Sequence, residues 1–139
     1  MLTFSPDAHQ MLQLARKEAD RLSHRYVGTE HLLLGMLKAE EGIVHEFLRS
    51  LTPDLAAFCS DIERGASAER DESRASSPYS ERFRRVMALA DLEAAQLHSS
   101  FLGSEHLLLG LLREGGGHAA AVLQLCGADA DRLRRLIAV

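Results

Sequence analysis

The chain has 139 residues and a formal net charge of −4 at pH 7, with 46% hydrophobic and 26% charged residues. This length fits one compact domain with a core of ordinary size. Neither half of the chain is a basic patch, which argues against nucleic acid or an anionic membrane as the main partner.

The sequence also restricts the compartment. No run of residues is long and apolar enough to span a bilayer, and the N-terminus lacks the basic-then-apolar layout of a signal peptide. Cys59 and Cys126 lie in apolar helical patterns, without the spacing of metal ligands or redox pairs. We therefore expect a soluble cytoplasmic protein with reduced cysteines, although two cysteines alone leave a disulfide open.

Residues 5–22 are expected to form a first helix, because apolar residues recur there at i, i+3, i+4 and i+7. Ser5 lies where an N-cap belongs, with Pro6 at the first helical position. Gly28 then breaks the chain, and Thr29 is predicted to cap a second helix. That helix is apolar almost all round, so we expect it to be the buried centre of its unit.

Two more helices are predicted next, over residues 43–51 and 55–62. The segment 65–78 is small, polar and charged, which is typical of a flexible linker. After it the pattern starts again. The octet Gly28–Gly35 (GTEHLLLG) returns as Gly103–Gly110 (GSEHLLLG), shifted by 75 positions, which indicates an internal repeat.

The second copy repeats the signals of the first. Ser80 corresponds to Ser5, and Ser104 corresponds to Thr29 as the predicted cap of the second helix. The sequence thus predicts an all-α fold in which a duplicated four-helix repeat forms one compact, pseudo-two-fold domain of about eight helices. The expected limits are residues 1–64 for repeat one, 65–78 for the linker and 79–139 for repeat two.

Catalytic motifs are missing from the sequence. It contains no G-x-x-x-x-G-K-[ST] loop for nucleotide phosphates, no G-x-S-x-G elbow and no H-E-x-x-H pair. An alternative is a metal-dependent hydrolase that draws on His31 and His106 with Glu30 and Glu105. Metal sites usually have a third or fourth ligand with recognisable spacing, so we interpret both histidines as structural supports of a helix start. We expect no enzymatic activity, no metal and no cofactor.

Glu30 and Glu105 each lie in the first turn of a predicted helix. A carboxylate at this position is favoured by the helix dipole, which is a sufficient structural role. The functional alternative is that each carboxylate faces outward beside the start of a first helix, at Ser5 or Ser80. A helix N-terminus suits an anion and a carboxylate suits a guanidinium, so together they would hold a ligand with one cationic and one anionic end.

Phe4 and Tyr79 form another matched pair, each directly before a predicted N-cap. An apolar residue at this position usually forms a hydrophobic staple with the first turn of the helix. The alternative is a partly exposed aromatic side chain that contributes to an apolar docking groove.

Both octets, each preceded by [FY]-S and a helix, resemble the Clp N-terminal repeat domain, and the ClpC-type version most of all. The resemblance covers the chain outside the linker. It implies an all-helical domain that docks substrate and adaptor proteins for an AAA+ unfoldase. The ATPase rings, on the same chain or in trans, then thread these proteins into the Clp peptidase. No role with nucleic acid or membranes is implied.

The resemblance also implies a ligand. ClpC-type relatives read phosphoarginine, a degradation tag, with one pocket per repeat in which the motif glutamate grips the guanidinium and a hydroxyl residue helps with the phosphate. Carried over, these positions are Glu30 with Ser5 and Glu105 with Ser80. The family commonly has threonine at both serine positions. The remaining alternative is a stand-alone protein of the same fold that acts as an adaptor, a competitor or a sequestering module.

Overall fold

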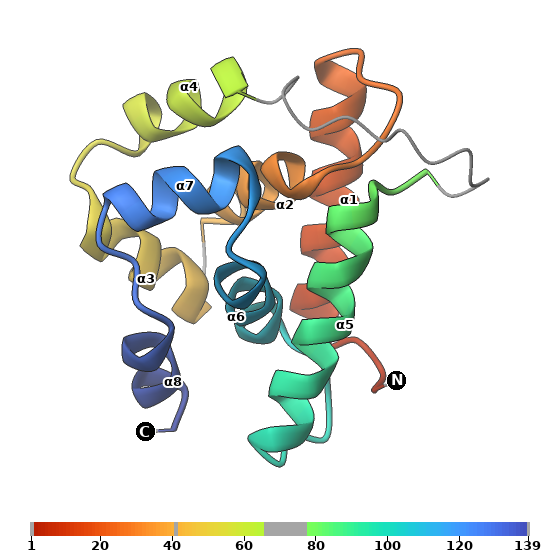
Figure 1. The fold of residues 1–139 in the computed structure, drawn as a ribbon, viewed down its shortest axis with the longest axis vertical. Coiled ribbons are helices and arrows are strands. Elements are labelled where there is room, and N and C mark those ends of the chain that lie inside the picture. Colours follow the sequence, from red (N-terminus) through yellow and green to blue (C-terminus); the bar gives the residue numbers. More distant parts are fainter. Residues whose placement is uncertain (1, 41, 66–77, 139) are drawn as a thin grey trace.

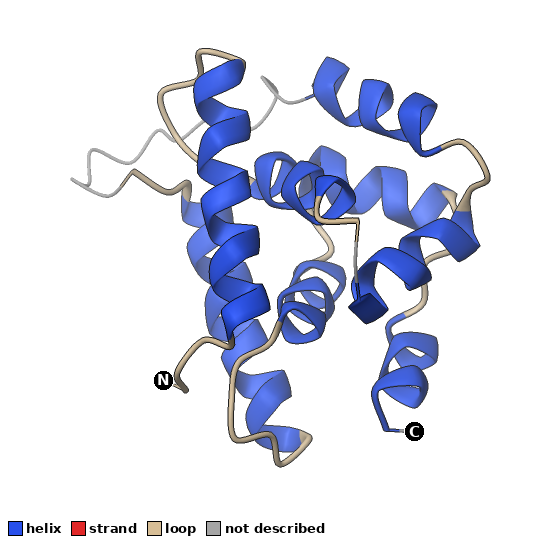
Figure 2. Cartoon of the chain, turned by 180° about the vertical axis from the view of Figure 1, so that it is seen from behind, coloured by secondary structure: helices blue, strands red, loops and turns tan. Residues whose placement is uncertain are grey.

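The computed structural model describes residues 2–40, 42–65 and 78–138 (Figure 1). Within these ranges the protein is built from helices, with no strand (Figure 2), which confirms the predicted all-α fold of four helices in each half. The predicted linker falls outside the described residues except for its end residues, Gly65 and Pro78. The helices are α1 (Pro6–Arg21), α2 (Thr29–Lys38), α3 (Gly42–Leu51), α4 (Leu55–Gly65), α5 (Glu81–Gln96), α6 (Ser104–Glu114), α7 (Gly117–Leu125) and α8 (Ala130–Ala138).

The two motif helices, α2 and α6, occupy the centre of the molecule. Every residue of α2 from Thr29 to Leu37 is buried, and α6 is buried from His106 to Leu111. Helices α1 and α5 run antiparallel on one side of this centre, and α3, α4, α7 and α8 cover the other (Figure 1). The predicted burial of the motif helices is confirmed. Among the described helices, none has both the length and the apolar character needed to cross a bilayer.

The glycine that ends each motif is needed for close packing between helices. A Cβ atom on Gly35 would lie 3.0 Å from the backbone nitrogen of Ala15 in α1. A Cβ atom on Gly110 would lie 2.5 Å from the carbonyl oxygen of Val86 in α5. Because each obstacle is backbone, a larger residue would push the paired helices apart.

The start of each motif helix is capped by its histidine. The helix begins at Thr29 or Ser104, whereas the N-cap is the preceding glycine in an extended conformation. The Nδ1 atom of His31 accepts the Gly28 N–H at 2.8 Å, and His106 makes the same 2.8 Å bond with Gly103 N–H. The structural role predicted for both histidines is confirmed. The predicted capping by Thr29 and Ser104 is wrong, because the imidazole at the third helical position performs it.

Two short backbone pairings join the repeats crosswise. Ser5 N–H donates to the Leu102 carbonyl at 3.0 Å, directly before α6. In the same way, Ser80 N–H donates to the Val27 carbonyl at 2.9 Å, directly before α2. The start of each first helix therefore lies against the start of the other repeat's motif helix.

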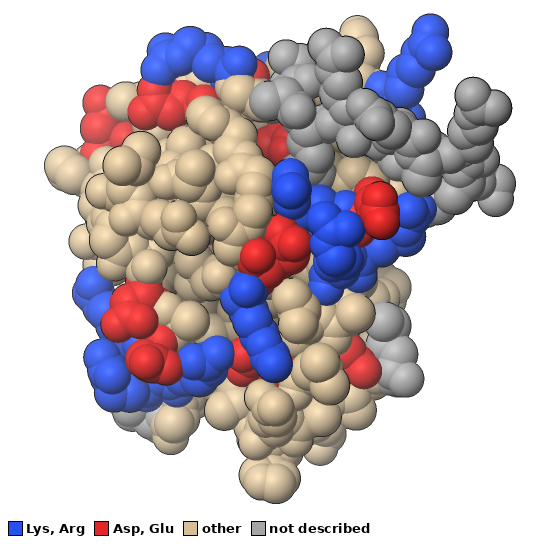
Figure 3. All heavy atoms as spheres, in the orientation of Figure 1, with Lys and Arg blue, Asp and Glu red and all other residues tan. Residues whose placement is uncertain are grey.

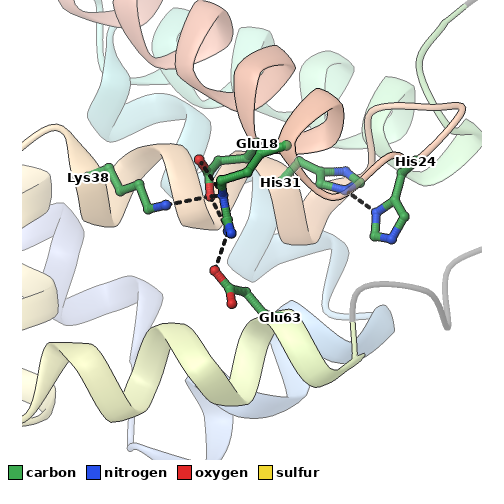
Figure 4. Close-up of polar contacts among 6 residues, drawn as sticks. Glu18, His24, His31, Lys38 and Glu63 are labelled. Atoms are coloured by element: carbon green, nitrogen blue, oxygen red, sulfur yellow. Dashed lines mark hydrogen bonds and ion pairs between the residues drawn. The ribbon is translucent and has the colours of Figure 1, made fainter.

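A buried glutamate anchors each first helix. Glu18 of α1 accepts hydrogen bonds from Lys38 at 2.7 Å and from Arg21 at 2.9 Å, and Arg21 also pairs with Glu63 of α4 (Figure 4). Burial raises the pKa of Glu18, but these bonds outweigh it and hold the pKa below its usual value. A buried carboxylate is stable only with such partners.

The equivalent residue in repeat two, Glu93, has different partners. Arg134 of α8 donates to both of its oxygens, at 2.6 and 3.2 Å, and Arg113 lies 3.6 Å away. The Arg134 hydrogen bonds lower the pKa of Glu93 despite its burial. This bidentate pair attaches the last helix of the described chain to α5.

Candidate functional site

An open groove of about 670 Å³ lies between α1 and α5. Its lining is mostly apolar, with cationic and polar side chains at Arg16, Arg84, His9 and Gln13. Most lining positions occur in pairs separated by 75 residues, so the groove straddles the pseudo-two-fold axis. These pairs are Phe4 with Tyr79, His9 with Arg84, Leu12 with Met87 and Gln13 with Ala88.

The matched aromatic residues Phe4 and Tyr79 lie half-buried in this groove. Phe4 contacts His9 edge-to-face with ring centroids 5.6 Å apart, which is the contact expected of a hydrophobic staple. Tyr79 stacks on Phe83 at 4.8 Å, and its hydroxyl accepts a hydrogen bond from Arg16 Nε at 2.7 Å. Each ring therefore supports its own helix start while one face lines the groove.

One end of α1 forms a charged site that we call the first corner, made of Ser5, Asp7, Ser104 and Glu105. The Ser5 hydroxyl accepts the Ala8 N–H at 3.3 Å and thereby caps α1, as predicted. The carboxylate of Asp7 accepts the same N–H at 2.9 Å, a hydrogen bond from the Ser5 hydroxyl, and one from the Ser104 hydroxyl at 2.7 Å.

The first corner holds two carboxylates, those of Asp7 and Glu105, and they interact electrostatically. Burial and the charge of Asp7 together raise the pKa of Glu105. Burial also raises the pKa of Asp7, but hydrogen bonds from Ser5, Ser104 and the Ala8 amide outweigh it and hold that pKa below its usual value. The negative charge of Asp7 is thus stabilised by hydrogen bonds. The charged form of Glu105, whose side chain is 23% exposed, is disfavoured because Asp7 lies nearby.

The opposite end of the groove has a second corner, made of Ser80, Glu30, Arg82 and Arg84. Ser80 caps α5 by accepting the Phe83 N–H at 3.1 Å, as predicted. Arg82 occupies the position equivalent to Asp7, and its Nε donates to Glu114 at 3.1 Å. Figure 3 shows basic side chains gathered over the first turns of α5, with acidic side chains among them. The two corners therefore have opposite charge character.

The structure corrects two expectations about the motif glutamates. Glu30 does not face outward, because it is completely buried, whereas Glu105 is partly exposed. Nor do Glu30 and Ser5 share a corner. Ser5 lies at the start of α1 against the segment before α6, whereas Glu30 lies in the first turn of α2. The crossed backbone pairings instead bring Glu105 toward Ser5 and Glu30 toward Ser80.

The metal-site alternative loses its geometric basis for the same reason. His31 and His106 lie in the first turns of two different helices, α2 and α6. Each uses Nδ1 to cap its own helix, and His31 Nε2 also lies 2.8 Å from His24 Nδ1 (Figure 4). In the described parts of the chain, no three His, Cys, Asp or Glu side chains are grouped to hold a metal ion. Cys59 and Cys126 are both free and half-buried.

From the sequence we did not identify Asp7 and Arg82, the residues that give the two corners different charges. Asp7 and Arg82 occupy equivalent positions with opposite charges, which a residue-by-residue comparison of the two repeats reveals directly. Arg16 and Arg84 line the groove from helix positions that look like ordinary solvated charges in the sequence. Their role follows only from the placement of α1 beside α5.

Comparison with known proteins gives consistent results. The family model of the Clp repeat (R) N-terminal domain matches residues 3–126. The chloroplastic chaperone protein ClpC of Pisum sativum is 40% identical over 131 residues, which are 94% of this chain and 14% of that protein. The chloroplastic ClpA homolog CD4B of Solanum lycopersicum, an ATP-binding subunit of the ATP-dependent Clp protease, gives the same values. This chain therefore corresponds to a small part of these relatives.

Solved structures share the fold. The N-terminal domain of ClpD from Arabidopsis thaliana superposes with a TM-score of 0.69 at 23% identity, covering 96% of this chain and 94% of that one. The Hsp104 N-terminal domain from Candida albicans gives a TM-score of 0.72 at 15% identity, covering 96% and 87%. The matched motifs, the pseudo-symmetric helices and these similarities together show that the chain belongs to the Clp N-terminal repeat domain family.

Proposed function

We propose that this domain docks substrate and adaptor proteins for a Clp-type AAA+ unfoldase, and that the groove between α1 and α5 is the docking surface. The observation that carries the proposal is the groove itself, an open, mostly apolar channel with the Phe4–Tyr79 pair in its wall. Aromatic side chains in partly desolvated pockets are the usual anchors of protein interfaces. The docked proteins pass to an ATPase ring on the same chain or in trans. The cytoplasmic location remains a prediction, since the relatives named above are chloroplastic.

The polar groups of the groove indicate what kind of protein segment would bind there. Arg16 and Arg84 supply donors and positive charge beside an apolar floor, and His9 adds a polar ring. An extended segment of an unfolded protein with apolar anchors and flanking acidic residues complements both features. A segment with flanking lysines would meet like charges and bind less tightly.

Fluorescence anisotropy tests the groove. The probe is a labelled peptide that alternates leucine or phenylalanine with glutamate, and a second peptide carries lysine in place of each glutamate. We expect Phe4→Ser and Tyr79→Ser each to weaken binding of the acidic peptide roughly tenfold, because each truncates an anchor. The matched control is Leu125→Ser, which removes a leucine that is 89% exposed and distant from the groove lining. Unchanged binding in both groove variants, with circular dichroism showing folded protein, would contradict the proposal.

We further propose that the domain reads phosphoarginine at the second corner, with Glu30 as the guanidinium partner and Ser80 beside the phosphate. Glu105 and Ser5 are the equivalent residues of the first corner. The charges favour the second corner, where Arg82 and Arg84 accompany Ser80. Glu30 is fully buried, so binding there requires the carboxylate to become exposed. Once exposed, the Glu30 carboxylate could accept two parallel, charge-assisted hydrogen bonds from the guanidinium of the ligand.

Calorimetric titration of phosphoarginine tests this finer proposal. The wild type is expected to bind, and Glu30→Gln, which keeps the side-chain shape but removes the charge, is expected to weaken binding by at least tenfold. Unmodified arginine is the control ligand, since it lacks the phosphate. If a folded wild type binds neither ligand, the tag proposal fails while the groove proposal stands on its own test.

A further inference from the structure

We propose that Asp7 is an internal anion that fills the phosphate subsite of the first corner and so closes that corner to phosphorylated ligands. This inference rests on the proposed reading of phosphoarginine and makes it specific. The two repeats would then differ in ligand, with a phosphorylated side chain accepted only at the second corner. Asp7 is in this sense the specificity-determining residue of repeat one.

The hydrogen bonds of Asp7 are those that a bound phosphate would need. Its Oδ1 accepts the Ala8 N–H at 2.9 Å at the start of α1 and also a bond from the Ser5 hydroxyl. Its Oδ2 accepts the Ser104 hydroxyl at 2.7 Å from the start of α6. A helix start with free N–H groups and hydroxyls is a natural anion site. Here the chain's own carboxylate takes these donors.

The charges at the first corner also oppose a phosphate. Asp7 and Glu105 are close enough for the charge of one to perturb the ionisation of the other. A phosphoryl group carries about −1.5 to −2 charges near neutral pH. It would have to displace Asp7 and then lie beside two carboxylates, so like-charge repulsion adds to the lost hydrogen bonds.

The second corner lacks this arrangement because the equivalent residue is basic. Position 82 carries an arginine, held by Glu114 at 3.1 Å. The acidic residue of the first turn of α5 is Glu81, and it pairs with Arg85 at 3.5 Å along the outer surface of the helix. The carboxylate in the first turn of α5 is thus directed along its own helix, whereas the one in α1 folds back over the N-terminus.

The test counts sites and locates them. We expect calorimetry to give one equivalent of phosphoarginine for the wild type, and two for Asp7→Arg, which copies position 82. Asp7→Ala vacates the subsite without adding charge and is expected to gain a weaker second equivalent. Glu46→Ala, at an exposed position of α3 on the other side of the molecule's centre, removes the same charge and should behave as the wild type. Circular dichroism establishes that each variant is folded.

A second probe, inorganic phosphate followed by NMR, keeps the inference separate from the tag proposal. We expect phosphate to shift the Phe83 amide in the wild type and the Ala8 amide only when Asp7 is replaced. If the wild type ignores phosphoarginine yet shows this phosphate pattern, the tag proposal fails and the inference holds. Two wild-type equivalents, equal shifts at Ala8 and Phe83 in the wild type, or no response at Ala8 in either Asp7 variant would each overturn it.

Discussion

The two repeats are nearly identical in their motif helices and opposite in charge at the starts of their first helices. The histidines, leucines and final glycines of the motif serve capping and packing: the histidines accept a backbone N–H, the leucines are buried and the glycines admit a neighbouring helix. Asp7 and Arg82, in contrast, lie in the first turns of α1 and α5, where Asp7 is exposed and Arg82 is half-buried, and neither belongs to the hydrophobic core. The comparison shows that the duplicated scaffold is constrained by packing, while its ends have diverged into different binding environments.

The buried glutamates allow the sharpest comparison of stability. Removing Arg134 leaves Glu93, which is 1% exposed, with Arg113 at 3.6 Å as its one remaining ion-pair partner among the described residues. We therefore expect Arg134→Ala to cost about 2–3 kcal/mol. Removing Arg21 leaves Glu18 with Lys38 at 2.7 Å, and we expect about 1 kcal/mol or less. Urea denaturation measures both, with the exposed Arg135→Ala as control on the same helix. Equal losses would contradict this account of the two anchors.

For the motif glycines, too, we expect the larger loss of stability in repeat two. Gly110→Ala places a methyl group 2.5 Å from the Val86 carbonyl oxygen, whereas Gly35→Ala places it 3.0 Å from the Ala15 nitrogen. Alanine gains up to about 1 kcal/mol of helix propensity. Overpacking costs about 1–3 kcal/mol. We therefore expect a net loss of about 1–2 kcal/mol at Gly110 and a smaller loss at Gly35. A larger loss at Gly35 in the same denaturation assay would refute this ranking.

The capping histidine of repeat two predicts a pH dependence. Burial lowers the pKa of His106 below its ordinary value of 6.5, although the charges of Glu93 and Asp7 oppose this shift. The neutral ring is also the form whose Nδ1 can accept the Gly103 N–H. The unfolded chain then binds the proton more readily, so the contribution to stability is complete above pH 6.5 and decreases as the pH falls through the folded pKa.

Unfolding measured at several pH values between 7.5 and 5 checks this prediction. His106→Gln keeps an acceptor at the third helical position without a titrating ring, so it is expected to flatten the slope. An unchanged slope in this variant would assign the pH dependence to other groups.

The smallest expected effect concerns the carboxylates of the first corner. Asp7→Asn removes a negative charge beside Glu105 and should therefore bring the raised pKa of Glu105 closer to its ordinary value. Carboxyl NMR titration measures this directly, with Glu93 as an internal reference whose pKa is set by Arg134. No movement at Glu105 would mean that its raised pKa comes from burial alone.

The fold was predictable because its signals are local and occur twice. The helical periodicity, the serine caps at Ser5 and Ser80 and the apolar motif helices all specify structure within a few residues. The duplication repeated each signal.

The site was less predictable because it depends on how the repeats combine. The pairing of Ser5 with Leu102 and of Ser80 with Val27 is crossed, and no local pattern distinguishes a crossed arrangement from a direct one. The burial of Glu30 and the position of Arg16 beside Tyr79 likewise arise from contacts between distant segments. The cap at Thr29 was misassigned because a histidine two residues later competes for the same role.

Site-specific photo-crosslinking to an unfolded protein tests the central claim most directly. A photoreactive phenylalanine analogue replaces Ala88, an exposed residue of the groove lining, or Leu125, which is 89% exposed outside it. The account predicts crosslinks from position 88 that are lost when the acidic, apolar peptide is added in excess, and few from position 125. Crosslinks from position 125 alone, or equal and uncompeted crosslinks from both, would show that the groove is not the docking surface.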